Sequence, residues 1–123
     1  NTHYIYNQDN IMFVKPSRSI PLEIIVKGYI ADNTHSSINY RGGTEEYHDI
    51  HLNPEYTRNE RLETPIVLVK DKTNLLISSL EIIEKNILTF LEWELISKIV
   101  LKLYEYGSEE AIKKGLILVD TKY

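Results

Sequence analysis

The sequence contains no cysteine, so disulfides and thiolate metal sites are both excluded. No apolar run approaches the ~20 residues that span a bilayer, and the first residues lack the basic and apolar regions of a secretory signal, so no membrane partner is expected. Acidic residues outnumber basic ones by 18 to 14 and the basic residues form no block, which argues against a nucleic-acid partner. There is also no glycine-rich phosphate loop. These absences favour a protein of the cytoplasm whose ligands are small molecules.

The composition fits one ordinary globular domain. The chain has 123 residues, of which 42% are apolar and 26% charged, and these values are typical of a folded chain with a modest core. We therefore expect a single domain over residues 1–123.

Two strand patterns occupy the first quarter of the chain. Residues 4–14 place aromatic and β-branched residues on either side of a polar turn at 7–10, which predicts a hairpin. Residues 20–31 carry the strongest strand signal, with alternating faces. One face holds Glu23 and Lys27, roughly 13 Å apart along the strand. Such a pair can flank a binding patch, or it can simply belong to a solvated sheet face.

A polar excursion follows at residues 32–63, where hydrophobic periodicity fades. A long insertion of this kind is often functional, although a poorly ordered one would have the same composition. His48 and His51 lie within it, but they lack helical spacing and a third ligand, so we expect no metal site.

Short strand and helix signals alternate in the second half. Residues 66–69 form a brief strand pattern and residues 70–74 a charged turn. Ser78 and Thr89 each begin a capping box, which predicts one helix ending near Leu88 and a second, amphipathic helix. Gly107 is expected to interrupt that second helix before a last helical segment. Trp93 and the nine tyrosines fit core and boundary positions better than a base-stacking platform, because no basic groove accompanies them.

The most informative segment is residues 115–122, where four apolar residues follow a glycine and run into Asp120 and Lys122. The apolar run predicts a buried strand, and the period of two places these two charged side chains on one face at its end. Functional groups often lie where a strand leaves the core, although a strand that ends in solvent looks the same. The fold class expected from all these patterns is α+β, an antiparallel sheet with helices packed on one side.

Three segments together resemble the SAICAR synthetase family. They are Ile20-Pro-Leu-Glu-Ile-Ile-Val-Lys-Gly-Tyr-Ile30, Asn59-Glu-Arg-Leu-Glu-Thr-Pro-Ile66, and Leu103-Tyr104 through Gly115-Leu-Ile-Leu-Val-Asp-Thr-Lys-Tyr123. Each motif is only moderately specific, but their order and spacing agree with the family across nearly the whole chain. The resemblance implies that this chain corresponds to the end of the family's first subdomain and to most of its central subdomain.

The resemblance implies an ATP-dependent ligation in purine biosynthesis. L-aspartate would be joined to carboxyaminoimidazole ribonucleotide with Mg²⁺ assisting, so the implied ligands are ATP, L-aspartate and the aminoimidazole ribonucleotide. It implies substrate contacts from Glu23, Lys27 and Ser36, catalytic roles for Asp120 and Lys122, and a further nucleotide contact from Lys122. None of these residues is implied as a metal ligand, and a homo-oligomer is compatible with the family.

The chain also departs from the family's pattern. Lys27 stands where the family usually has arginine, which keeps the charge but loses the bidentate fork. Asp32-Asn33 replaces a Gly-Ser pair, and no His-Asp follows Thr64-Pro65, where Lys70 or Lys72 is left as the counterpart of the family's lysine. The family's amino-terminal phosphate loop and its Glu-Phe-Gly motif have no counterpart among these residues. Either a fragment of the enzyme or a diverged module that binds without catalysis is therefore expected.

Overall fold

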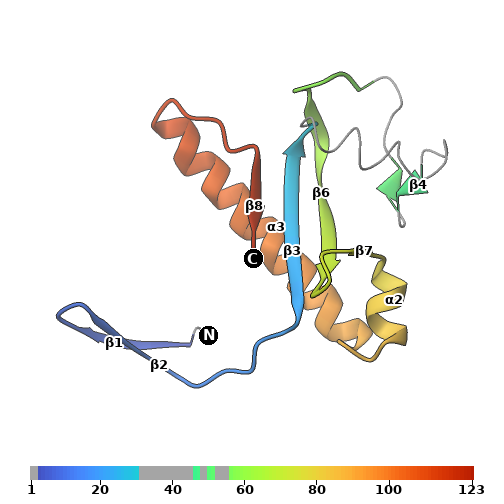
Figure 1. The fold of residues 1–123 in the computed structure, drawn as a ribbon. Coiled ribbons are helices and arrows are strands. Elements are labelled where there is room, and N and C mark those ends of the chain that lie inside the picture. The colour runs from blue at the N-terminus through green and yellow to red at the C-terminus, as the bar shows by residue number, and fades with distance from the viewer. Residues whose placement is uncertain (1–2, 31–45, 48–49, 52–55) are drawn as a thin grey trace.

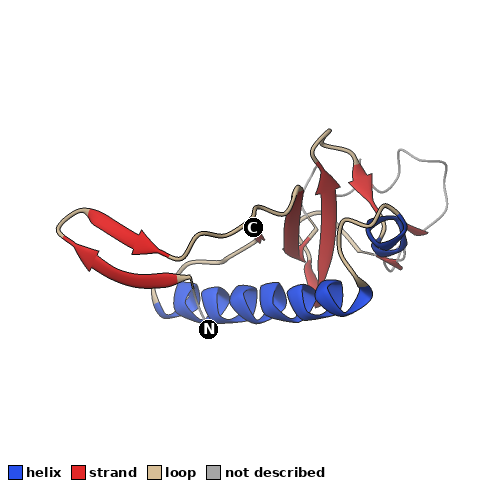
Figure 2. Ribbon diagram, turned by 90° about the horizontal axis from the view of Figure 1, so that it is seen from below, coloured by secondary structure: helices blue, strands red, loops and turns tan. Residues whose placement is uncertain are grey.

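The computed structural model describes residues 3–30, 46–47, 50–51 and 56–123. Its centre is a four-stranded antiparallel sheet in the order β7-β6-β3-β8, formed by Leu76–Ile77, Arg61–Asp71, Leu22–Tyr29 and Asp120–Lys122. Helix α3 (Phe90–Lys113) runs across one face of this sheet, and the short helix α2 (Ser79–Glu84) lies beside it (Figures 1 and 2). The predicted α+β class with helices on one side is confirmed.

The predicted amino-terminal hairpin is present as β1 (Tyr4–Gln8) and β2 (Ile11–Val14), which pair in antiparallel fashion. Asp9 occupies the turn with a positive φ of 50°, a conformation that aspartate tolerates better than most residues. The rings of Tyr6 and Phe13 stack across the hairpin with centroids 4.4 Å apart. The hairpin extends away from the main sheet (Figure 1), and its apolar side chains are exposed.

The main core lies between the sheet and α3. Alternate residues of β3, including Ile24 and Val26, meet Val100 and Tyr104 of α3 in one buried cluster. The other residues of β3 face the opposite side, as the alternation predicted. That opposite side carries a smaller buried pair, Ile25 and Leu68.

The excursion predicted over residues 32–63 is only partly described. It contains the two-residue strands β4 (Glu46–Tyr47) and β5 (Ile50–His51), which pair with each other. Ser36 and His48 lie outside the described residues, and for His51 the structure describes only the backbone.

Strand β6 is much longer than the predicted strand at residues 66–69, because it begins at Arg61, inside the predicted excursion, and ends at Asp71. The sequence suggested a break at Pro65. Instead the register jumps there, since Lys27 faces Ile66 whereas Tyr29 faces Arg61. A bulge of this kind accommodates a proline, which has no amide hydrogen for a regular ladder.

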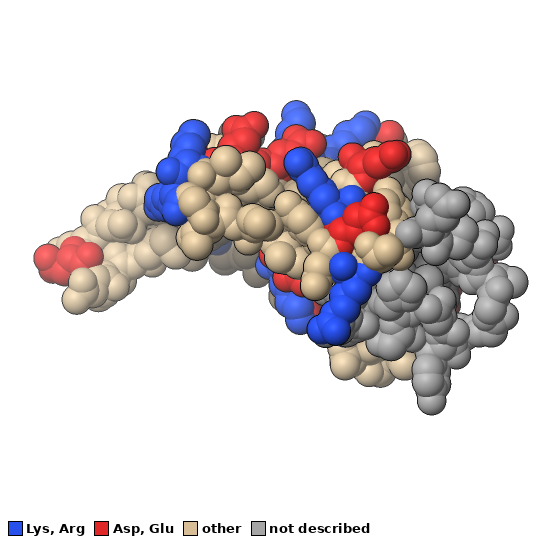
Figure 3. Space-filling model, turned by 90° about the horizontal axis from the view of Figure 1, so that it is seen from above, with Lys and Arg blue, Asp and Glu red and all other residues tan. Residues whose placement is uncertain are grey.

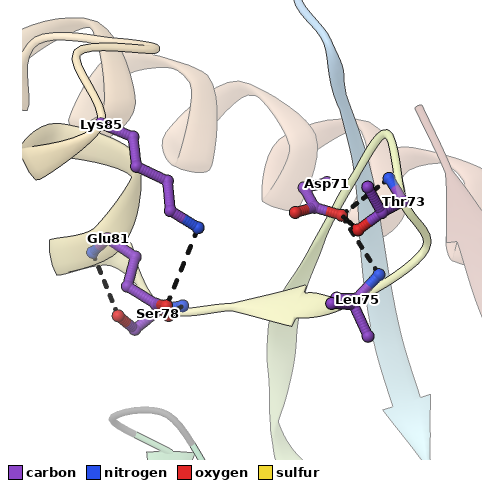
Figure 4. A network of polar contacts seen from close by, with 6 residues as sticks. All are labelled: Asp71, Thr73, Leu75, Ser78, Glu81 and Lys85. Atoms are coloured by element: carbon purple, nitrogen blue, oxygen red, sulfur yellow. Dashed lines mark hydrogen bonds and ion pairs between the residues drawn. The ribbon is translucent and has the colours of Figure 1, made fainter.

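The turn predicted at residues 70–74 is confirmed, and it leads into a short strand, β7, that was not predicted. Asp71 accepts hydrogen bonds from the Thr73 backbone amide (2.8 Å), the Thr73 hydroxyl and the Leu75 amide (3.2 Å) (Figure 4). Asn74 has a positive φ of 65°. These contacts fix the turn that joins β6 to β7.

Both predicted capping boxes are present. The Ser78 hydroxyl accepts from the Glu81 amide at 3.1 Å while the Glu81 carboxylate accepts from the Ser78 amide at 2.7 Å (Figure 4). Thr89 and Glu92 repeat this arrangement at the start of α3. Helix α2 ends at Glu84 rather than near Leu88, because Asn86 adopts a left-handed φ of 53° that no α-helix continues.

Helix α3 is continuous for 24 residues, so the predicted interruption at Gly107 is wrong. A methyl group at Gly107 would lie 3.1 Å from Leu118 Cδ2. The glycine therefore allows Leu118 to pack closely against the helix and does not interrupt it. The helix ends at Lys113 and is followed by a glycine cap. Gly115 has a φ of 72°, and the amides of Gly115 and Leu116 bond to the carbonyls of Ile112 and Ala111 in a Schellman pattern.

The buried strand predicted for residues 116–119 is also wrong. Strand β8 begins only at Asp120, and Leu116 and Ile117 are 62% and 68% exposed. The Val119 carbonyl accepts from the Gly28 amide of β3 at 3.0 Å, and the Leu118 carbonyl accepts from the Tyr104 hydroxyl at 2.8 Å. Leu116 and Ile117 lie beyond the end of β3 at Tyr29, so they have no strand to pair with. No helix in the part of the chain that the structure describes combines the length and apolarity needed to span a membrane.

Candidate functional site: paired charges on the open face of the sheet

The candidate site lies on the sheet face opposite α3 and is assembled from the middle and the end of the chain. Strand β8 pairs with β3 so that Asp120 faces Lys27 and Lys122 faces Ile25. Side chains two residues apart share a face of a strand, so Asp120 and Lys122 lie on the same side as Glu23 and Lys27. The structure therefore brings together all four of the described candidate residues.

The four side chains form two ion pairs. Lys122 Nζ lies 2.9 Å from Glu23 Oε1, close enough for a hydrogen bond, and both side chains are substantially exposed. Lys27 Nζ lies 3.8 Å from Asp120 Oδ2, which is an electrostatic contact without a short hydrogen bond. The lysine side chain of this second pair is only 8% exposed, whereas the aspartate is 41% exposed.

Burial distinguishes Lys27 from the other lysines of the site. It is the one charged residue among the buried polar residues of the described chain. Loss of solvent lowers the pKa of Lys27 below its ordinary value, the Asp120 charge opposes this shift, and the neighbouring Lys122 and Lys70 add to it. A cation of this kind is poorly hydrated, and one of its contacts is the exposed carboxylate of Asp120.

The exposed pair behaves in the usual way for opposite charges. The hydrogen bond from Lys122, followed by its charge, lowers the pKa of Glu23. The same hydrogen bond and the Glu23 charge raise the pKa of Lys122. Both groups are therefore held in their charged forms.

A third cation of this face, Lys70, was missing from the predicted site residues. It lies opposite Glu23 in the β3–β6 register, and its Nζ donates to Asn74 Oδ1 at 3.0 Å. Lys72 instead lies in the turn after β6, so Lys70 is the one of the two that shares the site's face. The alternation of Ile66, Leu68 and Lys70 could have placed Lys70 on this face. It was missed because the predicted strand stopped at residue 69.

The face carries three lysines and two carboxylates, and a hollow of about 340 Å³ opens beside it. This hollow is shallow and open to solvent, and Glu23 is the one candidate residue in its lining, which consists of Ile20, Pro21, Leu22, Glu23, Asp71, Lys72 and Asn74. Seen from above (Figure 3), acidic and basic side chains are interspersed along the upper side of the molecule and do not form a patch of one sign. The arrangement suits a small ligand that carries both anionic and amine groups.

We predict that the two lysines give the stability of the fold opposite dependences on alkaline pH. Because the pKa of Lys27 is lowered, the unfolded chain binds more protons between that pKa and 10.5, so this residue makes the free energy of unfolding rise with pH in that interval. The pKa of Lys122 is raised in the folded state. Lys122 therefore adds to the free energy of unfolding below pH 10.5, and this addition is lost as the pH rises through the pKa of Lys122 in the folded chain.

Urea unfolding of the wild type, Lys27→Met and Lys122→Met between pH 7 and 11 measures these dependences. Compared with the wild type, Lys27→Met should lack the rise in the free energy of unfolding below pH 10.5. Lys122→Met should lack the decline in that free energy at higher pH. Parallel curves for the three proteins would contradict both assignments.

The helix-backed antiparallel sheet, with paired charges on its open face, gives the chain an α+β fold with one candidate site. A family model described as SAICAR synthetase matches residues 1–123. The chain belongs to the SAICAR synthetase family, as its resemblance predicted.

Known members of the family are similar over nearly all of this chain. The phosphoribosylaminoimidazole-succinocarboxamide synthase of Legionella pneumophila (strain Paris) is 36% identical over 119 residues, which cover 93% of this chain and 38% of that protein. A structure titled SAICAR-synthase from Saccharomyces cerevisiae complexed with SAICAR is 25% identical, with a TM-score of 0.74 over 90% of this chain and 35% of that one. The Ehrlichia chaffeensis synthase shares the fold, with 23% identity and a TM-score of 0.74 over 98% of this chain and 46% of its own. The chain thus spans less than half the length of these relatives.

Proposed function

We propose that this chain forms the substrate-binding part of an ATP-dependent ligase that joins L-aspartate to carboxyaminoimidazole ribonucleotide and yields SAICAR. The single observation that carries the proposal is the pairing of β3 with β8, which brings Glu23, Lys27, Asp120 and Lys122 onto one open face. Family membership supports the reaction class, and the yeast relative's structure is titled as a complex with SAICAR. The cytoplasm is the compartment that we propose for it.

The charges of the site match the groups that such a reaction must hold. The ribonucleotide and L-aspartate bring carboxylate and phosphate groups, for which Lys27 and Lys122 are suitable partners. The attacking amine needs an acceptor that orients it, and Glu23 or Asp120 can accept its hydrogen bonds. We include Ser36 as a substrate contact on the resemblance alone, since it lies outside the described residues.

ATP would activate the substrate carboxylate by phosphorylating it, and Mg²⁺ would neutralise charge on the phosphoryl oxygens. Among the residues that the structure describes, no three histidine or carboxylate side chains converge on a point that could hold a metal ion. Both carboxylates of the site already face lysines. We therefore assign none of the described residues to the metal. Lys122 remains our candidate for contact with the nucleotide.

Binding of SAICAR to the purified chain tests the proposal by isothermal titration calorimetry. We expect saturable 1:1 binding that Glu23→Gln weakens about tenfold, because the loss of one charge-assisted hydrogen bond corresponds to about 1.4 kcal/mol. Glu84→Gln, at the exposed end of α2, is the matched control and should bind as the wild type does. Absence of SAICAR binding, or equal binding by both variants, would refute the assignment of this face.

The alternative function is a module that binds the ligand without catalysis. It is favoured by the departures from the family's pattern at Lys27 and at Asp32-Asn33. ADP release from ATP, Mg²⁺ and carboxyaminoimidazole ribonucleotide, measured with and without L-aspartate, distinguishes the two functions. Aspartate-dependent release identifies a ligase, whereas SAICAR binding without release identifies the binding module.

A further inference from the structure

The hydroxyl of Tyr104 connects helix α3 to the segment of chain that enters strand β8. Tyr104 is only 5% exposed, and its hydroxyl donates to the Leu118 carbonyl at 2.8 Å. The next carbonyl along the chain, that of Val119, accepts from the Gly28 amide at 3.0 Å. Two successive carbonyls are therefore held immediately before Asp120, one by the helix and one by β3.

The ring of Tyr104 has little freedom to move. It lies so close to Gly28 that a Cβ could not be added there without a clash. It also belongs to the buried cluster between the sheet and α3. The packed core therefore fixes the hydroxyl, and the hydroxyl in turn fixes the Leu118 carbonyl.

These contacts adjoin one charge pair of the candidate site. Gly28 follows Lys27 and Val119 precedes Asp120, and Lys27 faces Asp120 in the β3–β8 register. Lys27 Nζ and Asp120 Oδ2 are 3.8 Å apart, which is too long for a hydrogen bond to fix their separation. The distance between the two charges therefore depends on where the backbone of β8 lies.

The other side chains of this segment hold it to α3 less firmly. Thr121 pairs with Val26, whose side chain is in the core beside α3, but the buried Thr121 hydroxyl has no hydrogen-bond partner among the residues that the structure describes. The Tyr123 hydroxyl reaches the Val100 carbonyl of α3 only at 3.5 Å, the outer limit for such a contact. Of these two hydrogen bonds between α3 and the segment, the one from Tyr104 is much the shorter.

We propose that Tyr104 is a positioning residue for the candidate site, and that its hydroxyl sets the distance between Lys27 and Asp120 from the opposite side of the sheet. Such a role rests on the function proposed above, because the distance matters for binding only if the open face holds the ligand. Tyr104 packs on the α3 side, so it acts through the backbone before β8 and not by touching the ligand. Loss of the hydroxyl lets Asp120 move away from Lys27, and a displaced charge holds a ligand less well.

The titration of Lys27 reports this distance without any ligand. NMR of protein carrying ¹³Cε-labelled lysine follows it in the wild type, Tyr104→Phe and Asp120→Asn, and the Lys27 signal is the one missing from Lys27→Met. The Asp120 charge favours protonated Lys27, so the pKa of Lys27 should be lower in Tyr104→Phe than in the wild type and lowest in Asp120→Asn. Lys122 and Lys70, whose charges also act on Lys27, are the same in these three proteins. If Tyr104 served only the stability of the core, Tyr104→Phe would unfold at a lower temperature while Lys27 titrated as in the wild type.

Calorimetric titration with SAICAR measures the consequence for binding. Tyr104→Phe should bind about fivefold more weakly, within the range for residues that influence a site without touching its ligand. The matched control is Tyr106→Phe, which removes a hydroxyl from the same helix at a residue that is 65% exposed. This control should match the wild type in both measurements.

The two measurements separate failure of the positioning role from failure of the proposed function. The positioning role is overturned if Lys27 titrates in Tyr104→Phe as it does in the wild type, whatever the affinity for SAICAR. It is also overturned if Tyr104→Phe binds SAICAR as tightly as the wild type does. If the wild type itself does not bind SAICAR, the proposed function fails, and the titration still shows whether Tyr104 sets the distance between the two charges.

Discussion

Replacement of Gly28 by alanine should destabilise the fold by about 3 kcal/mol or more, the upper part of the range for overpacked cores. Gly28 lies on the face of β3 that meets α3, and an added Cβ would lie 1.9 Å from the Tyr104 hydroxyl oxygen and 2.6 Å from the ring carbon that bears it. The ring cannot retreat freely, because its hydroxyl donates to the Leu118 carbonyl at 2.8 Å. The shift in the urea midpoint, followed by circular dichroism, measures the loss.

Two further variants show whether the contact with Tyr104 is the cause. Gly107→Ala should change the free energy of unfolding by less than about 1 kcal/mol, because the gain in helix propensity offsets a contact with one flexible leucine methyl. Tyr104→Phe removes the nearest clashing atom, so it should recover part of the loss in a Gly28→Ala background. If Gly28→Ala unfolds at the same urea concentration as Gly107→Ala, the close approach of β3 and α3 is wrong.

Replacement of Lys27 by methionine should have the largest effect on ligand binding, with SAICAR affinity reduced about 100-fold. The lysine is buried and its charge lies at the open face beside Asp120. Truncation of a desolvated partner in a charge contact costs about 2–5 kcal/mol of binding free energy. Calorimetric titration with SAICAR measures the change.

The fold itself should tolerate this substitution, because methionine fills a similar volume without the cost of burying a charge. Thermal unfolding of Lys27→Met at or above the wild-type temperature would therefore separate lost binding from lost structure. Lys27→Arg keeps the charge and restores the fork that the family usually has, so it should bind SAICAR at least as tightly as the wild type. Weaker binding by Lys27→Arg would count against a contact between this position and the ligand.

The sequence was most informative where a short periodic pattern decides the structure. The alternation along β3 predicted which residues face α3 and which face the site, because each strand residue points opposite to its neighbours. The capping boxes at Ser78 and Thr89 were equally reliable, since they depend on hydrogen bonds within four residues. The same reasoning placed Asp120 and Lys122 on one face.

The errors arose where distant contacts override a local pattern. Leu116 and Ile117 have the composition of a buried strand, but whether such residues pair depends on where β3 ends. Gly107 disfavours a helix locally, yet α3 continues through it, and Leu118 packs closely at this position. The ion pairs themselves could not be predicted, because no local rule states which strand β8 joins.

Strand β8 is only three residues long, and this has a consequence for how the site forms. Asp120 follows Lys27 by 93 positions (120 minus 27), so β8 can pair only after a long loop has closed, at an entropic cost that grows slowly with loop length. During synthesis, β8 emerges after β3 and β6, so it would complete the charge arrangement on a sheet that those two strands have already nucleated. A brief detachment of β8 could likewise dismantle the site while the rest of the sheet stays folded, so hydrogen exchange at Thr121 and Lys122 should be faster than in the middle of β3.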